Sequence, residues 1–97
     1  MREIKWNKNA LRQFQAALTF IGKDSLGNAY KVKQALLEKI EALSRNAELY
    51  TPDKYKNDNT GNYRAFELHR YRVSYLVKSN EVIIARIRHT SQEPKMY

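Results

Sequence analysis

The sequence predicts an α+β fold in which a helical hairpin packs on one face of an antiparallel sheet, in the order β-α-α-β-β-β. Two amphipathic segments in the first half of the chain are joined by almost no loop. Three runs rich in aromatic and β-branched residues follow one another through short turns in the second half. Since each layer needs a partner for its apolar face, a two-layer sandwich follows. We expect a single domain over residues 1–97, with a tail at 89–97.

The first element is a short strand over residues 2–6, where Ile4 and Trp6 alternate with polar residues. Either Asn7 or Asn9 can cap the helix that follows. That helix is predicted over residues 10–23 because apolar residues recur at helical spacing. They are Leu11, Phe14, Ala17, Leu18 and Ile21.

A second helix is predicted from about residue 26 to residue 45, after the capping signal Asp24-Ser25. Its apolar stripe consists of Ala29, Val32, Leu36, Leu37, Ile40 and Leu43. Because the link to the first helix is so short, the two must pack as an antiparallel hairpin.

Residues 46–61 form a loop by composition, rich in Asn, Asp, Pro and Gly. A loop of this length in a small domain is more often functional or mobile than idle, and the sequence does not decide which role residues 47–61 have.

Three strands are predicted over residues 63–68, 71–77 and 81–88, with turns at 69–70 and 78–80. Links this short indicate consecutive antiparallel hairpins. We expect the first strand of the chain to pair with this meander, since one strand alone is not stable. Pro94 argues against continuation of the last strand into the tail.

The net charge is +8, from 18 Lys and Arg against 10 Asp and Glu. Such a charge favours RNA, DNA, the ribosome or an acidic protein segment as partner. The alternative is a solvated surface with excess Lys. The absence of cysteine excludes disulfides and cysteine-based zinc sites, and we expect no metal or cofactor. No signal peptide or membrane-spanning run is visible, so a soluble, cytoplasmic protein is expected.

Strand alternation places arginines on the face of the sheet that the helices leave uncovered. Arg72 alternates with Val73, Tyr75 and Val77 of its strand, which are expected to face the core. On the last strand the predicted core residues are Ile83, Ala85 and Ile87, and the predicted uncovered residues are Val82, Ile84, Arg86 and Arg88.

Clustered arginines repel one another unless an anion binds them, and guanidinium binds phosphate or carboxylate in a bidentate manner. We therefore predict a phosphate or acidic-peptide site at Arg72, Arg86 and Arg88. The parity of Arg64 does not decide which face it takes. The alternative is that nearby carboxylates neutralise the arginines as cross-strand pairs. The candidates are Glu67, Glu81 and Glu93.

Four short motifs, in this order and spacing, resemble the RelE/ParE superfamily of bacterial toxins. Tyr71-Arg72-Val73-Ser74-Tyr75 is similar to the Tyr-Arg-apolar-x-Tyr strand of these toxins, and residues 82–89 are similar to a last strand ending apolar-Arg-apolar-x-His. Residues 39–48 resemble the second helix and its exit, and Tyr63-Arg64 matches the opening of the second strand. The resemblance covers essentially the whole chain.

The resemblance implies the toxin of a type II toxin–antitoxin (plasmid stabilisation) module, a growth inhibitor neutralised by an acidic segment of a cognate antitoxin in a hetero-oligomer. RelE-like members cut messenger RNA on the ribosome without metal, whereas ParE-like members inhibit DNA gyrase. The long helical hairpin is more ParE-like, so we expect inhibition of a target such as gyrase. The alternatives are a RelE-like endoribonuclease and a non-toxic nucleic-acid-binding domain.

The resemblance also implies site residues. Arg72 matches the arginine of the middle strand, Arg64 falls where several members carry Lys or Arg, and Tyr97 takes the place of a C-terminal tyrosine. His89 is a candidate general acid or base, a role that histidine commonly takes in catalysis. Its alternative role is that of a strand-end residue that hydrogen-bonds the tail, and Tyr97 is alternatively a frayed end. Gln92-Glu93-Pro94 and Phe66 depart from the RelE pattern, which has basic residues there.

Overall fold

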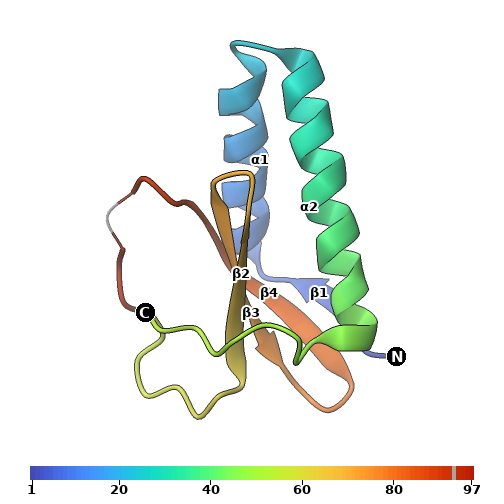
Figure 1. Ribbon diagram of the computed structural model, residues 1–97, viewed down its shortest axis with the longest axis vertical. Helices are drawn as coiled ribbons and strands as arrows, with labels where there is room; N and C mark the ends of the chain where they lie inside the picture. The colour runs from blue at the N-terminus through green and yellow to red at the C-terminus, as the bar shows by residue number, and fades with distance from the viewer. Residues whose placement is uncertain (93) are drawn as a thin grey trace.

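The computed structural model describes residues 1–92 and 94–97. A helical hairpin covers one face of a four-stranded sheet, and the other face carries the loop and tail described below (Figure 1). The elements are β1 (Glu3–Trp6), α1 (Lys8–Gly22), α2 (Leu26–Asn46), β2 (Tyr63–Leu68), β3 (Tyr71–Val77) and β4 (Glu81–His89). The predicted α+β fold and element order are confirmed.

Both helices begin at side-chain caps. The Asn7 side chain accepts a hydrogen bond from the amide of Ala10 at 2.7 Å, so Asn7 rather than Asn9 caps α1. The hydroxyl of Ser25 accepts a hydrogen bond from the amide of Asn28 at 3.0 Å and caps α2. These caps explain why two helices can follow each other with only three residues between them.

The core lies between the hairpin and the sheet. The predicted buried stripe of α2 is confirmed at Ala29, Val32, Leu36, Ile40 and Leu43. On α1 the prediction was wrong at Leu11, which is 45% exposed, while Ala10 is fully buried. Tyr75 is fully buried at the centre of the sheet, and its hydroxyl donates to the carbonyl oxygen of Ala47 at 2.7 Å.

The strand order is β1-β4-β3-β2. The meander is antiparallel as predicted, and β1 joins its β4 edge, which confirms that the first strand pairs with the meander. That pairing is parallel, so the sheet is mixed rather than purely antiparallel. The reason is that the helical hairpin returns the chain to the end of the sheet where β1 began.

A β-bulge changes the alternation along β4. Ser74 pairs with Arg86 and Tyr75 with Ile84, so Ala85 is an extra residue that shifts the side-chain phase. The prediction was wrong before the bulge: Val82 and Ile84 are fully buried against the helices. Ile83, predicted in the core, instead faces the side opposite Val82 and Ile84, and Ala85 is only half-buried.

After the bulge the predicted phase holds. Ile87 is buried, and Arg86 and Arg88 lie opposite it on the face away from the helices. We call this side, with Arg72, Ser74, Arg86 and Arg88, the open face. Neither of the two helices in the described part of the chain is long and apolar enough to cross a membrane.

Candidate functional site

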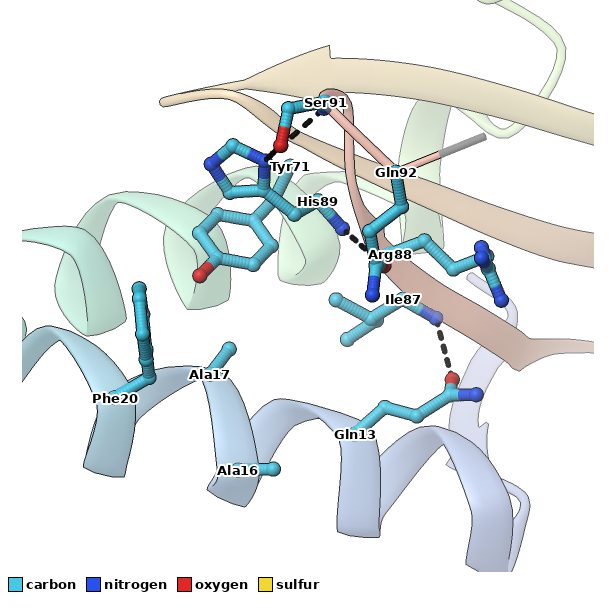
Figure 2. A pocket seen from close by; sticks show the side chains of 10 residues that line it. All are labelled: Gln13, Ala16, Ala17, Phe20, Tyr71, Ile87, Arg88, His89, Ser91 and Gln92. Carbon is cyan, nitrogen blue, oxygen red and sulfur yellow. Dashed lines mark hydrogen bonds between the residues drawn. The ribbon is translucent and has the colours of Figure 1, made fainter. Parts of the chain in front are cut away.

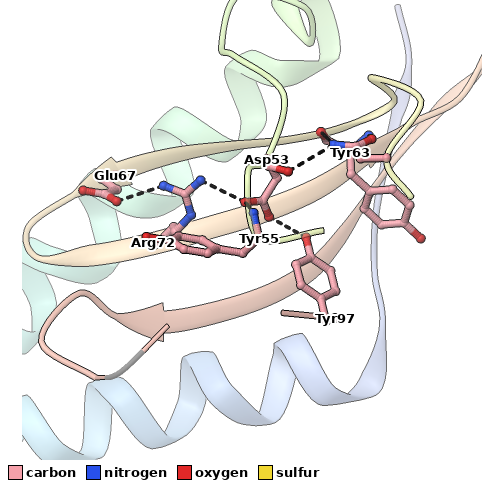
Figure 3. Close-up of polar contacts among 7 residues, drawn as sticks. Asp53, Tyr55, Tyr63, Glu67, Arg72 and Tyr97 are labelled. Carbon is pink, nitrogen blue, oxygen red and sulfur yellow. Dashed lines mark hydrogen bonds and ion pairs between the residues drawn. The ribbon is translucent and has the colours of Figure 1, made fainter. Parts of the chain in front are cut away.

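The loop between α2 and β2 brings a carboxylate onto the open face. Pro52 forms a bridge with Arg64, and the amide of Asp53 donates to the carbonyl oxygen of Tyr63 at 2.8 Å (Figure 3). This stretch of the loop therefore runs along the outer edge of β2. The side chain of Asp53 then reaches over the sheet.

Asp53 is the centre of the site, and its side chain is fully buried. Its carboxylate accepts hydrogen bonds from the guanidinium of Arg72 at 2.9 Å, the hydroxyl of Tyr97 at 2.6 Å and the amide of Tyr55 at 3.1 Å. Burial alone raises the pKa of Asp53. The hydrogen bonds from Tyr97, Arg72 and Ser74 outweigh burial and hold the pKa below its ordinary value. Asp53 is therefore an anion at neutral pH.

Arg72 is paired with two carboxylates. Besides Asp53, its guanidinium donates to Glu67 of β2 at 2.9 Å, and it stacks 4.9 Å from the centre of the Tyr55 ring (Figure 3). Burial lowers the pKa of Arg72, but the hydrogen bonds to Asp53 and Glu67 raise it further, so the charge is retained. The predicted neutralisation by Glu67 as a cross-strand partner is confirmed.

The two other carboxylates proposed for this role behave differently. Glu81 forms ion pairs with Lys5 at 3.1 Å and Lys78 at 3.8 Å, not with an arginine of the open face. Glu93 lies outside the described residues.

Tyr97 is held on the open face by its backbone as well as its hydroxyl. Its amide donates to the carbonyl oxygen of Tyr55 at 3.0 Å, and its carbonyl oxygen accepts from the amide of Asn57 at 2.7 Å. Burial and the hydrogen bond to Asp53 raise the pKa of the Tyr97 hydroxyl, which stays protonated at neutral pH. The expectation of a frayed end is not met here.

Arg86 lies over the ring of Tyr97, with its guanidinium carbon 4.2 Å from the ring centre. Burial lowers the pKa of Arg86, and the neighbouring charges of Arg88 and Arg72 lower it as well. Among the described residues no carboxylate forms an ion pair with Arg86. In the described part of the chain, the ring of Tyr97 rather than a carboxylate is thus the partner of Arg86.

Arg88 is the third of the predicted arginines, and it lies opposite Arg72 in the register of β3 and β4. A small cavity of about 50 Å³ on the open face is lined by all three arginines, and Tyr55, Glu67 and His89 are among the other residues that line it. The arginines predicted from strand alternation therefore come together around a space suited to one small anionic group.

Arg64 takes the other side of the sheet. It shares the parity of Phe66, which is buried in the core, and its guanidinium donates to the carbonyl oxygens of Glu48 and Tyr50. Arg64 therefore holds the first residues of the loop after α2 by these hydrogen bonds, and it does not lie with the three arginines of the open face.

His89 lines the same small cavity, but its ring packs on the side of β4 away from the open face. Its ring packs edge-on against Tyr71 with ring centres 5.1 Å apart, and Tyr71 is a core residue. Its Nδ1 accepts a hydrogen bond from the amide of Ser91 at 3.0 Å (Figure 2). This is the arrangement expected of a strand-end residue that hydrogen-bonds the tail.

A larger cavity of about 470 Å³ lies beside His89, between α1 and the end of β4 (Figure 2). Gln13 stands at its α1 side, where its side chain accepts a hydrogen bond from the amide of Ile87 at 2.8 Å. The side chain of Phe20, 65% exposed, marks its outer end. Within the described residues there is no group of three or more His, Asp or Glu that could hold a metal ion.

Asp53 and Tyr55 could not be identified as site residues from the sequence. Both lie in a segment whose composition indicates only a loop, and their roles depend on the path of that loop across the sheet. The one available signal was the Pro52-Asp53 pair, a common turn dipeptide that carries no information about a distant arginine.

Comparisons with known proteins agree on the fold. The chain is similar to a chain of the chromosomal ParDE toxin–antitoxin system from P. aeruginosa, with a TM-score of 0.72 and 20% identity, covering 94% of this chain and 98% of that one. It is also similar to the YoeB dimer of Staphylococcus aureus, with a TM-score of 0.54 and 19% identity over 91% of this chain and 95% of that one. A conserved hypothetical protein from Helicobacter pylori gives a TM-score of 0.54 and 20% identity, over 95% of this chain and 98% of that chain.

A search of curated proteins found no match to the chain. The family model for the ParE toxin of the type II toxin–antitoxin system parDE, however, matches residues 4–94. This match spans both helices, β2, β3, β4 and all but the first residue of β1, including the arginines of the open face. The chain therefore belongs to the ParE toxin family and is the toxin component of a type II toxin–antitoxin system.

Proposed function

We propose that this toxin inhibits its target by binding it, with DNA gyrase as the expected target, and that it does not cleave RNA. One observation carries the proposal: the groups that would cleave RNA are engaged elsewhere or lie on different faces. The hydroxyl of Tyr97 donates a hydrogen bond to Asp53, Arg72 is paired with two carboxylates, and the ring of His89 packs on the core side of β4.

Metal-free RNA cleavage needs a base for the ribose 2′-oxygen, an acid for the leaving oxygen and cations for the phosphorane. The raised pKa of Tyr97 makes it a poor base. The carboxylate of Asp53 is anionic but fully buried, so it cannot reach a ribose. Among the described residues, neither Tyr97 nor Asp53 therefore supplies the base beside Arg86 and Arg88, and the ring of His89 packs on the core side of β4.

The partner that keeps this toxin inactive is expected to be an antitoxin with an acidic segment. A chain of a ParDE system is among the similar structures, which supports an antitoxin partner. The net charge of +8 supports an acidic binding segment. We expect the affinity of the complex to fall with salt, because exposed charges are screened. The cytoplasm is the expected compartment, since gyrase, the ribosome and the antitoxin all occur there.

A ribosome-dependent endoribonuclease is the second candidate. The observation in its favour is that Arg72, Arg86 and Arg88 line one small cavity next to the Tyr97 ring. Such a cluster suits a phosphate of a nucleic acid, and an aromatic ring beside it could stack on a base.

Two assays on the purified toxin separate these functions. A supercoiling reaction with DNA gyrase should be inhibited, while a cell-free translation reaction analysed by primer extension should show intact message. His89→Ala should inhibit gyrase as well as the wild type does. Discrete cuts within translated codons, absent without ribosomes and lost in His89→Ala, would reject inhibition by binding and establish the endoribonuclease.

A further inference from the structure

The loop after α2 and the end of the chain together cover the open face of the sheet. Ser74 and Ala65 pair with each other across β3 and β2, and both point away from the helices. They are nevertheless only 1% and 6% exposed. The side chains of Asp53 and Tyr97 hydrogen-bond with Ser74, and the amide of Ala65 donates to the carbonyl oxygen of Thr51 at 3.3 Å, so these two segments cover the pair. We call residues 51–59 and 94–97 the strap.

The strap supplies most of the contacts of two arginines. Asp53 and Tyr55 belong to it and contact Arg72, and Tyr97 belongs to it and stacks under Arg86. Of the partners described above for these two arginines, only Glu67 comes from the sheet itself. Removing the strap would therefore leave two guanidinium groups facing solvent with one carboxylate between them.

The strap is held mainly by polar contacts, besides one edge-on contact between the rings of Tyr97 and Tyr63, whose centres are 6.0 Å apart. None of its described residues belongs to the hydrophobic core cluster or packs against it. Its two halves are joined at Tyr97, through the hydroxyl to Asp53, the amide to Tyr55 and the carbonyl oxygen to Asn57 and Lys56. Segments with few buried apolar contacts open at a lower free energy than the core does.

We propose that the strap opens and closes over the open face, and that it competes with external anions for Arg72 and Arg86. In the closed state Asp53 occupies the position on Arg72 that a carboxylate or phosphate from outside would take. An anion that binds these arginines shifts the equilibrium towards the open state, by as much as its affinities for the two states differ.

The hydroxyl of Tyr97 is the contact to remove. Tyr97→Phe keeps the ring under Arg86 and deletes only the contacts of the hydroxyl, the bond to Asp53 and the one with Ser74, so the fold should be retained. Tyr30→Phe is the matched control, because it deletes a tyrosine hydroxyl from an exposed side chain of α2 that does not touch the strap. A hydrogen bond to a charged group is among the stronger ones in proteins.

The first measurement is amide hydrogen exchange at Asn57 and Tyr97, whose amides join the two halves of the strap. In Tyr97→Phe both should exchange at least about tenfold faster than in the wild type, which corresponds to about 1.4 kcal/mol. The buried amide of Val73 in β3, and all three amides in Tyr30→Phe, should be unchanged. Equal exchange at Asn57 and Tyr97 in the variant and the wild type would overturn the proposal.

The second measurement is a titration with inorganic phosphate, followed by the NMR signals of the Nε–H groups of Arg72 and Arg86. We expect Tyr97→Phe to bind phosphate about tenfold more tightly than the wild type and Tyr30→Phe do. An affinity that is the same in all three proteins would show that the strap and the anion do not compete. Neither measurement depends on whether the target is gyrase or the ribosome.

Discussion

The carboxylate of Asp53 should contribute strongly to the free energy of unfolding of this toxin. Asp53→Asn removes its charge while keeping its size. The carboxylate accepts bonds from Arg72 and Tyr97 at 2.9 and 2.6 Å. Bonds to a charged group contribute about 1.5–3 kcal/mol each, and the amide oxygen of Asn keeps one of them in weakened form. We therefore expect a loss of about 2–4 kcal/mol in the free energy of unfolding.

Glu67 limits how much free energy of unfolding the substitution Asp53→Asn can remove. Breaking a buried ion pair costs about 3–5 kcal/mol when it leaves an uncompensated charge, but Arg72 retains Glu67 as a partner. In a domain of this size a loss of 1 kcal/mol lowers Tm by about 4–8 °C, so a loss of about 2–4 kcal/mol should lower Tm by roughly 8–32 °C. Urea unfolding followed by circular dichroism measures the free energy directly.

The lowered pKa of Asp53 determines how its contribution to the free energy of unfolding depends on pH. The pKa of Asp53 lies below its ordinary value of 3.8, so the unfolded state binds more protons at this group than the folded state does. Its contribution is thus present above about pH 4 and is lost as the pH falls through the lowered pKa. The wild type and Asp53→Asn should converge in acid. Asp24→Asn, at an exposed position after α1, is the control. A difference that is under about 0.5 kcal/mol at pH 7, or that persists unchanged at pH 3, would refute this account.

Three further substitutions test the fold. His69 and Arg70 form the two-residue turn between β2 and β3, with φ values of 51° and 67° that residues with side chains rarely adopt. Replacement of the pair by Asn-Gly should therefore raise the free energy of urea unfolding by about 1 kcal/mol. An unchanged value would show that the turn is not strained. Tyr75→Phe leaves the carbonyl oxygen of Ala47 buried without its donor and should lower the same free energy by about 1–3 kcal/mol; a neutral effect would mean that water replaces the hydroxyl. Asn7→Ala should cost about 1 kcal/mol or more by the same measurement, and the exposed Asn9→Ala should cost much less.

The helices and the limits of β2, β3 and β4 could be predicted because their signals are local. Apolar spacing and caps define each helix, and alternation with turn residues defines each strand. The bulge in β4 could not be predicted in this way. The carbonyl oxygen of the extra residue, Ala85, accepts a hydrogen bond from the side chain of Asn7 at 3.0 Å, which comes from the far end of the chain. A tertiary contact of this kind leaves no periodic signal.

The residues of the candidate site could likewise be predicted only where the signal is local. Strand alternation placed Arg72, Arg86 and Arg88 on one face because the phase after the bulge matches the predicted one. It could not supply Asp53, since a loop residue has no period from which its direction can be read. Nor could it show that Tyr97 lies against that loop residue, because both positions depend on how the loop and the tail cross the sheet.

A buried ion pair, rather than an apolar contact, covers the open face of the sheet. Desolvating Asp53 and Arg72 costs several kcal/mol, and well-packed apolar residues of similar volume often give equal or greater stability. An apolar cover would, however, leave no charge for a ligand to compete for. A carboxylate on an arginine can be exchanged for another carboxylate or a phosphate at little net cost, because one charged partner replaces another. A polar strap is therefore suited to a surface that stays covered while the toxin is alone and becomes accessible when an anionic ligand takes the arginines.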